Sequence, residues 1–244
     1  MDALRIKNIK KQYQEVVAID DLSFAIENGV VTGIVGPNGS GKSTAMNIIS
    51  GMISMDDGAL VIGEKETLKR MLPYEAPVYG ITRTFQEVRL WEQMSVLDNL
   101  LVVLTERDLL DAFFERHGAF HLEQAEVILK RVDMWGKKDA LVANLSYGQR
   151  KLIEIARALA MGANIYLFDE PFAGLFPEMR KIVTAVIKEL KQEGKTVILI
   201  EHNMGLIREL CDHLIVMDSG KLLAEGKPEE VLARRDVVEA YLGE

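Results

Sequence analysis

Residues 36–44 read Gly36-Pro37-Asn38-Gly39-Ser40-Gly41-Lys42-Ser43-Thr44 and fit the phosphate-binding pattern G-x-x-x-x-G-K-[ST]. Apolar residues 30–35 before this loop predict a buried strand, and residues 44–50 after it predict the start of a helix. Glycines let successive backbone N–H groups turn toward an anion, and a helix N-terminus adds partial positive charge. We therefore expect residues 36–44 to bind a nucleoside triphosphate, with Lys42 at the β- and γ-phosphates and the Ser43 hydroxyl on Mg²⁺.

The composition restricts the partners and the compartment. The net charge of −8 argues against a nucleic-acid partner, because a phosphate backbone attracts clusters of Lys and Arg. The single Cys211 cannot form an internal disulfide, which suits a reducing cytoplasm, and we expect it to be a buried, inert thiol. The longest apolar stretches, such as 197–200, are too short to cross a membrane, and the N-terminus lacks a signal-peptide core. If the protein works at a membrane, another subunit must hold it there.

The order of apolar patterns predicts an α/β fold. Strand-like segments separated by helical lengths of chain imply a mainly parallel sheet, and a turn at 218–220 predicts a final hairpin. Besides 30–35, the predicted strands are 4–9, 22–26, 59–62, 165–168, 196–200, 214–217 and 221–224. Between residues 87 and 160 the strand patterns stop, and 96–104 and 122–132 show helical spacing. We expect one domain, with an α/β core at 1–86 and 161–244 and a helical subdomain at 87–160.

A second chemical motif follows the apolar segment 165–168, which ends in Asp169 and Glu170. A strand carries its last residue to the carboxyl edge of a parallel sheet, where α/β proteins bind ligands. We expect Asp169 to ligate Mg²⁺ beside the phosphate loop, and Glu170 to orient and polarise an attacking water. The alternative is a surface acidic pair at a strand end, and the phosphate loop upstream argues against it.

Residues 145–149 separate the families of phosphate-loop proteins. They read Leu145-Ser146-Tyr147-Gly148-Gln149, and Ser146 with Gln149 forms a capping-box pattern before the helical run 150–160. The segment resembles the Leu-Ser-Gly-Gly-Gln signature of the ATPase subunits of ABC transporters, with Tyr147 in place of the first glycine. In that family the signature, here Ser146, Tyr147, Gly148 and Gln149, contacts the γ-phosphate held by an opposite subunit. The resemblance thus implies a RecA-like P-loop core with an N-terminal antiparallel β region, and a dimer that sandwiches two ATP molecules.

The same resemblance covers nearly the whole chain and implies further site residues. Tyr13 matches the aromatic residue that stacks on adenine, and Gln86 matches the glutamine that touches Mg²⁺ and water. His202 matches the switch histidine at the γ-phosphate. Lys42, Glu170 and His202 are thus the expected catalytic residues of an ATP hydrolase, and Ser43, Gln86 and Asp169 the expected metal ligands. Phe176 departs from the family, because many members have an aspartate there that contributes to contacts across the dimer.

Within the family the chain most resembles importers of branched-chain amino acids, on the motifs 80–86 and 144–149 and the ending 240–244. Segment 169–174 and the same ending also resemble the lipopolysaccharide-export ATPase, whose usual two-glycine signature differs at Tyr147. Two further alternatives are a soluble, non-transport ABC ATPase and a small-molecule phosphoryl transferase, which would not need the signature.

The importer interpretation implies several partners and a location. We expect membrane permease subunits, an identical or different second ATPase, and indirectly a solute-binding protein outside the membrane, with this chain on the cytoplasmic face of the inner membrane. Candidate permease contacts beside Gln86 are Phe85, Val88, Leu90 and Trp91, which could instead form the subdomain's own core.

Overall fold

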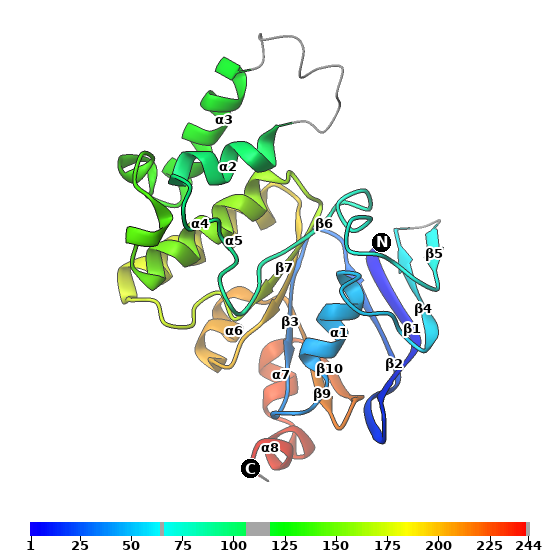
Figure 1. Cartoon of the computed structure of the whole chain (residues 1–244). Helices are drawn as coiled ribbons and strands as arrows, with labels where there is room; N and C mark the ends of the chain where they lie inside the picture. Colours follow the sequence, from blue (N-terminus) through cyan, green and yellow to red (C-terminus); the bar gives the residue numbers. More distant parts are fainter. Residues whose placement is uncertain (64–65, 106–117, 243–244) are drawn as a thin grey trace. The chain divides into compact units, whose positions relative to one another are not determined.

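The computed structural model describes residues 1–63, 66–105 and 118–242, which form two compact units (Figure 1). The first unit comprises Met1–Arg83, Asn164–Glu170 and Ile187–Glu244, and the second comprises Thr84–Ala163 and Pro171–Val186. Residues 243–244 of the C-terminal motif lie outside the described residues.

A mostly parallel sheet forms the centre of the first unit. Its order is β10-β9-β3-β8-β7-β6, with β10 antiparallel to β9 and the other neighbours parallel. The strands are β3 (Val31–Val35), β6 (Ile81–Arg83), β7 (Ile165–Asp169), β8 (Thr196–Ile200), β9 (His213–Asp218) and β10 (Lys221–Gly226). Every residue of β3, β7 and β8 is buried, as their continuous apolar sequences require of strands covered on both faces.

A second, antiparallel sheet in the same unit has the order β2-β1-β4-β5. It consists of β1 (Asp2–Tyr13), β2 (Val16–Glu27), β4 (Asp57–Ile62) and β5 (Glu66–Leu68). The hairpin of β1 and β2 extends past the predicted segments 4–9 and 22–26. The prediction stopped short because the far end of the hairpin is largely solvent-exposed and lacks apolar alternation. One hydrophobic cluster joins both sheets through helix α1 (Lys42–Ile49), whose Met46 and Ile49 are fully buried. This packing fixes the helix that follows the phosphate loop.

Helices complete both units. The first contains α6 (Met204–Leu210), α7 (Pro228–Leu232) and α8 (Arg235–Leu242). The second contains α2 (Val96–Leu104), α3 (Gly118–Arg131) and α4 (Tyr147–Ala160), with 3₁₀ turns at Trp135–Lys137 and Val142–Asn144. Helix α5 (Pro177–Gln192) begins in the second unit and ends in the first. Buried residues of α2, α3 and α4, such as Leu100, Leu129 and Leu152, form the interior of the second unit.

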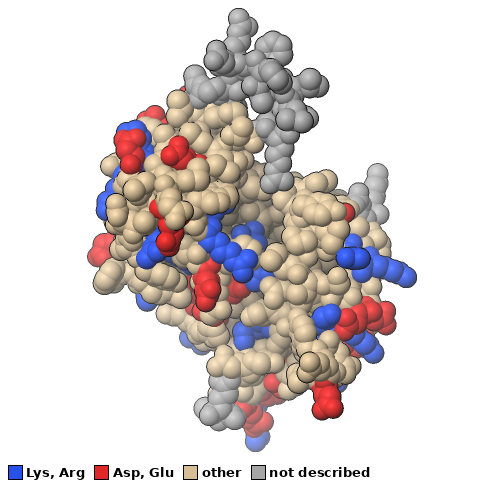
Figure 2. Space-filling model, viewed as in Figure 1, with Lys and Arg blue, Asp and Glu red and all other residues tan. Residues whose placement is uncertain are grey.

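The structure confirms the predicted α/β class, with its parallel core sheet, N-terminal antiparallel sheet and helical segment. It adds two strands that the sequence did not predict, β5 and β6, which have three residues each and are too short to show a periodicity. Within the described ranges, no helix combines the length and apolarity needed to cross a membrane. On the face drawn in Figure 2, basic and acidic side chains of the described residues are interspersed.

Candidate functional site

The predicted phosphate loop lies between β3 and α1. The chain turns at Gly36, where a Cβ atom would lie 2.0 Å from the Met217 carbonyl oxygen and 2.8 Å from Ser40 Oγ, so only glycine fits. Gly41 is the N-cap of α1 in a left-handed conformation, and no described side chain caps this helix. A loop built this closely around its backbone, leading into a helix N-terminus, is suited to receive a phosphate group.

Lys42 is the first residue of α1 and has an exposed fraction of only 7%. Its Nζ donates to the carbonyl oxygens of Gly36 (2.7 Å) and Pro37 (2.8 Å). The ammonium group is thus held against the loop itself, where its charge complements an anionic phosphate. Ser43, the next residue, is exposed on the first turn of the helix.

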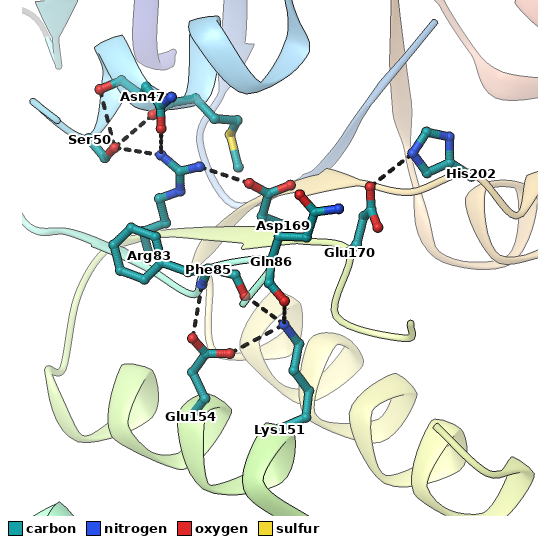
Figure 3. A network of polar contacts seen from close by, with 11 residues as sticks. Asn47, Ser50, Arg83, Phe85, Gln86, Lys151, Glu154, Asp169, Glu170 and His202 are labelled. Atoms are coloured by element: carbon teal, nitrogen blue, oxygen red, sulfur yellow. Dashed lines mark hydrogen bonds and ion pairs between the residues drawn. The ribbon is translucent and has the colours of Figure 1, made fainter. Parts of the chain in front are cut away.

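Asp169 ends β7 and forms a buried ion pair that was not predicted (Figure 3). The Arg83 Nη2 atom lies 2.8 Å from Asp169 Oδ2. Nη1 of Arg83 donates to Asn47 Oδ1 (2.6 Å) and to Ser50 Oγ (3.0 Å), both at the C-terminal end of α1. The guanidinium group therefore connects the predicted metal-binding carboxylate to the helix of the phosphate loop.

Glu170 and His202 lie together, as Figure 3 also shows: Glu170 Oε1 is 3.0 Å from His202 Nε2. Glu170 has a φ of 48°, a left-handed conformation that costs a non-glycine residue on the order of 1 kcal/mol and is concentrated at functional sites. The buried Glu201 carboxylate accepts hydrogen bonds from the backbone N–H groups of His202 (2.7 Å) and Asn203 (3.0 Å). Glu201 therefore fixes the backbone at His202, directly after the end of β8.

Tyr13 lies at the end of β1 with its ring partly exposed. The Lys11 ammonium is 5.4 Å from the centre of this ring and 2.6 Å from Asp56 Oδ1. The ring is accessible, which a base-stacking role requires.

The signature segment forms the N-terminus of α4 in the second unit. Ser146 Oγ accepts from Gln149 N (3.3 Å), and Gln149 Oε1 accepts from Ser146 N (3.1 Å), which is the predicted capping box. The Tyr147 ring lies over Gly174, where a Cβ atom would be 2.9 Å from Tyr147 Cε1. Gly148 packs closely as well, since a Cβ there would lie 2.5 Å from Met179 Sδ. Phe176 is 71% exposed.

Gln86 belongs to the second unit, where two charged residues of α4 hold the backbone next to it. Lys151, which is fully buried, donates from Nζ to the carbonyl oxygens of Phe85 (2.6 Å) and Gln86 (3.4 Å). Glu154 Oε1 accepts from Phe85 N (3.1 Å), and Glu154 Oε2 lies 3.3 Å from Lys151 Nζ. Burial raises the pKa of Glu154, while the charge of Lys151 opposes that rise. Both backbone groups of Phe85 are thus bound by one buried ion pair.

The candidate permease contacts follow directly in the chain. Phe85, Val88 and Leu90 are half-buried, and Trp91 is exposed. The Arg157 guanidinium of α4 lies 4.2 Å from the Trp91 ring centre and donates to the Arg89 carbonyl oxygen (2.6 Å), and burial lowers the pKa of Arg157. The segment is therefore packed on its own helix and also presents an exposed indole ring.

Four functional candidates were missed by reasoning from the sequence. The signal for each was a charged residue in a position whose neighbours are buried. Arg83 is the last residue of β6 and Glu201 directly follows β8, whereas Lys151 and Glu154 lie three apart on the packed face of α4. They are Arg83, Lys151, Glu154 and Glu201.

The glycine loop follows β3 of a parallel sheet and leads into a helix, and acidic residues stand at the end of β7, which is separated from β3 by β8 alone. This arrangement defines a P-loop nucleoside triphosphatase. A sequence model described as ABC transporter matches residues 19–173, and one described as branched-chain amino acid ATP-binding cassette transporter matches residues 221–244. The chain belongs to the ABC transporter family and is an ATP-hydrolysing ATPase subunit of that family.

Curated relatives agree over their full length. The "Probable branched-chain amino acid transport ATP-binding protein LivG" of Methanocaldococcus jannaschii is 38% identical, covering 100% of this chain and 98% of the relative. The "Lipopolysaccharide export system ATP-binding protein LptB" of Escherichia coli K12 is 33% identical, again covering 100% and 98%. The chain is therefore similar throughout to transport ATPases of two different kinds.

Solved structures show the same fold. An ATP-binding cassette of an ABC transporter in its ADP conformation matches with a TM-score of 0.86 and 37% identity over 100% of both chains. A dimeric cassette in a post-hydrolysis state, bound to ADP and phosphate, matches with a TM-score of 0.80 and 26% identity over 92% of this chain and 98% of that one. This chain is accordingly a nucleotide-binding cassette.

Proposed function

We propose that this ATPase powers the import of branched-chain amino acids, or a related small solute, through permease subunits in the inner membrane. The observation that carries the proposal is the match of residues 221–244 to the branched-chain amino acid cassette family. The full-length relative named for branched-chain amino acid transport supports it. In this proposal the chain sits on the cytoplasmic face, and a solute-binding protein outside delivers the solute.

The proposed chemistry is hydrolysis of ATP by positioning and charge stabilisation. Loop residues 36–44 would cradle the phosphates, Tyr13 would stack on adenine, and Lys42 would stabilise charge on the transferred phosphoryl group. Ser43, Gln86 and Asp169 offer the oxygen ligands that Mg²⁺ prefers, and the bound ion would supply positive charge that stabilises the phosphates during transfer. The buried ammonium at the loop carbonyls and the carboxylate at the end of β7 support this assignment.

Glu170 and His202 would act on the water. Glu170 would orient and polarise it, and His202 would hold the γ-phosphate and the water in line. Their 3.0 Å separation and the hydrogen bond that the His202 N–H donates to the Glu201 carboxylate support the pairing.

The proposed working unit is a dimer with an identical or a different ATPase. Residues Ser146, Tyr147, Gly148 and Gln149 would face the γ-phosphate held by the partner, where the capped N-terminus of α4 has N–H groups to offer. The exposed Phe176 would pack on the partner where many relatives have an aspartate. ATP would close the dimer and hydrolysis would reopen it. The division into a core at 1–86 and 161–244 and a helical subdomain at 87–160 stays a prediction.

A second candidate is lipid export, because the similarity to the lipopolysaccharide-export ATPase also spans the whole chain. Affinity purification of the tagged chain from its native membrane, followed by mass spectrometry, tests both. Two amino-acid-type permeases would support import, and envelope lipid-export subunits would support export. A chain recovered alone or with soluble proteins would contradict both.

A matched variant makes that purification specific to the candidate contact surface. Trp91→Ala removes the exposed ring, whereas Trp135→Ala removes an indole from a separate 3₁₀ turn of the same unit. If the segment 85–91 contacts the permeases, only Trp91→Ala should reduce their recovery. Equal recovery with wild type and both variants would remove this surface from consideration.

A further inference from the structure

We propose that Arg83 is a positioning residue of the metal site. Its guanidinium group ties the Asp169 carboxylate to α1 and so holds that carboxylate in the orientation in which it would bind Mg²⁺. This inference rests on the proposed role of Asp169 as a metal ligand. It assigns a task to a buried arginine that the proposed mechanism does not use.

The contacts of Arg83 are directional. Nη2 lies 2.8 Å from Asp169 Oδ2, whereas Nη1 donates in another direction to Asn47 Oδ1 (2.6 Å) and Ser50 Oγ (3.0 Å). The Ser50 hydroxyl donates its own hydrogen to the Met46 carbonyl oxygen (2.8 Å), which leaves the oxygen to accept from the arginine. The guanidinium is thus anchored on α1 independently of Asp169.

Burial makes the pair consequential. The side chains of Arg83 and Asp169 are only 7% and 6% exposed. A buried carboxylate without a partner is strongly disfavoured, so removing one member of such a pair costs far more than removing a surface pair. Arg83 therefore restrains the orientation of the Asp169 carboxylate before nucleotide arrives.

A positive charge beside a cation site would at first be expected to repel Mg²⁺. However, Mg²⁺ reaches such a site together with ATP, and the complex carries net negative charge, so the arginine does not oppose its arrival. The contact of Arg83 with Asp169 is made through Oδ2 of the carboxylate. Arg83 also links β7 to the helix that carries Ser43, and so sets the spacing of two expected metal ligands.

Lysine cannot replace this function. A guanidinium is a planar fork that donates in several fixed directions at once, whereas an ammonium is a point charge on a flexible stem. Arg83→Lys preserves the charge but loses the simultaneous contacts to Asp169, Asn47 and Ser50. Arg83→Met removes both charge and contacts at a similar volume.

The test is equilibrium binding of a fluorescent ATP analogue to the whole chain, first in EDTA and then across a Mg²⁺ titration. We expect Arg83→Met to raise the Mg²⁺ concentration at half-saturation about tenfold or more, and Arg83→Lys to raise it several-fold, on the scale seen when a residue that orients a metal ligand is removed. Binding in EDTA should stay within about twofold, since the phosphate loop is unchanged. The control Arg235→Met removes an exposed arginine of the same unit and should match wild type.

The outcomes separate this inference from the proposed function. If Arg83→Met does not fold, Arg83→Lys and Asn47→Ala, which removes one anchor without changing charge, decide in its place. Half-saturation within twofold of wild type in the folded Arg83 variants would overturn the inference. Asp169→Asn should abolish the Mg²⁺ dependence. If it does so while the Arg83 variants behave as wild type, only the Arg83 inference fails, whereas an unchanged Mg²⁺ dependence in Asp169→Asn overturns both.

Discussion

Nε2 of His202 lies 3.0 Å from Oε1 of Glu170, and the register of the parallel sheet produces this pair. Asp169 at the end of β7 is paired with Ile200 at the end of β8, so the residues that follow each strand emerge side by side. The Glu170 N–H donates to the Ile200 carbonyl oxygen (3.0 Å), which extends the ladder past the last strand residue. Glu201 then fixes the backbone at His202. The candidate catalytic pair therefore follows from strand pairing between segments far apart in sequence.

The contact between Tyr147 and Gly174 predicts a paired effect on stability. In Gly174→Ala the new Cβ would meet the Tyr147 ring at 2.9 Å at a φ of +70°, and we expect a loss of about 2 to 4 kcal/mol in the free energy of unfolding from strain plus overpacking. The matched control Gly162→Ala has a φ of +59° and open space around its Cβ, so it should lose only the backbone part, about 1 kcal/mol.

Urea unfolding of Gly174→Ala in a Tyr147→Ala background gives the decisive comparison. Removing the ring should bring the cost of Gly174→Ala down to that of Gly162→Ala. Equal costs of Gly174→Ala with and without Tyr147 would show that the ring does not restrict this position.

The buried pair of Lys151 and Glu154 predicts a pH-dependent loss of stability. Lys151→Met leaves the Glu154 carboxylate without its cation and the Phe85 carbonyl without its donor, and should cost about 3 to 5 kcal/mol near pH 8. Burial raises the pKa of Glu154, and removal of Lys151 takes away the largest influence that opposes this rise. A raised pKa in the folded state favours the protonated form, so the cost should shrink as the pH falls toward 5.

Urea unfolding of wild type and Lys151→Met at pH 8 and pH 5.5 measures this effect. Lys130→Met, at an exposed pair on α3, is the control and should change stability by less than about 1 kcal/mol at either pH. A cost for Lys151→Met that is the same at both pH values would contradict the ionised, buried Glu154.

The burial of Cys211 leads to two predictions, one on the reactivity of its thiol and one on the stability of the protein at high pH. Burial raises the pKa of its thiol from 9.0 to about 12, with Asp212 and Glu201 adding to the rise. At pH 8 the folded protein should therefore hold about a thousandfold less thiolate than the unfolded chain, and alkylation should be slower in proportion. Rapid stoichiometric alkylation of the native protein at pH 8 would show that the thiol is not buried as described.

The same thiol affects stability at high pH. Because its folded pKa lies above its unfolded value, its contribution is fully present below about pH 9 and is lost as the pH rises toward 12. Between these values wild type should lose about 1.4 kcal/mol per pH unit relative to Cys211→Ala. Denaturation curves of both proteins at pH 8.5 and pH 10.5 measure the difference, and parallel curves would contradict it.

The parts of this protein that could be predicted from sequence are those with local patterns. The phosphate loop, the strand ending in Asp169 and the capping box of Ser146 and Gln149 each lie within a short segment whose spacing carries the information. The buried Cys211 was likewise predicted correctly from its isolation in the chain.

The parts that could not be predicted depend on pairing across the chain. Arg83 and Asp169 are 86 residues apart, and β6 is too short to be recognised as a strand from its sequence. Lys151 and Glu154 form a polar pair on the packed face of α4. Their burial is explained by their hydrogen bonds to the backbone of Phe85, which lies far away in the sequence. A charged residue among apolar neighbours in the sequence indicates a buried polar contact, but only the fold shows which residue is its partner.

The central proposal is that Glu170 activates the attacking water, whereas the nucleotide is bound by other residues. The most direct test measures ATP affinity and steady-state ATP hydrolysis of Glu170→Gln in one preparation, beside wild type. Our account predicts an affinity within about threefold of wild type and a turnover lowered by about a hundredfold or more, the scale of losing a general base. Turnover close to that of wild type, with binding intact, would contradict it.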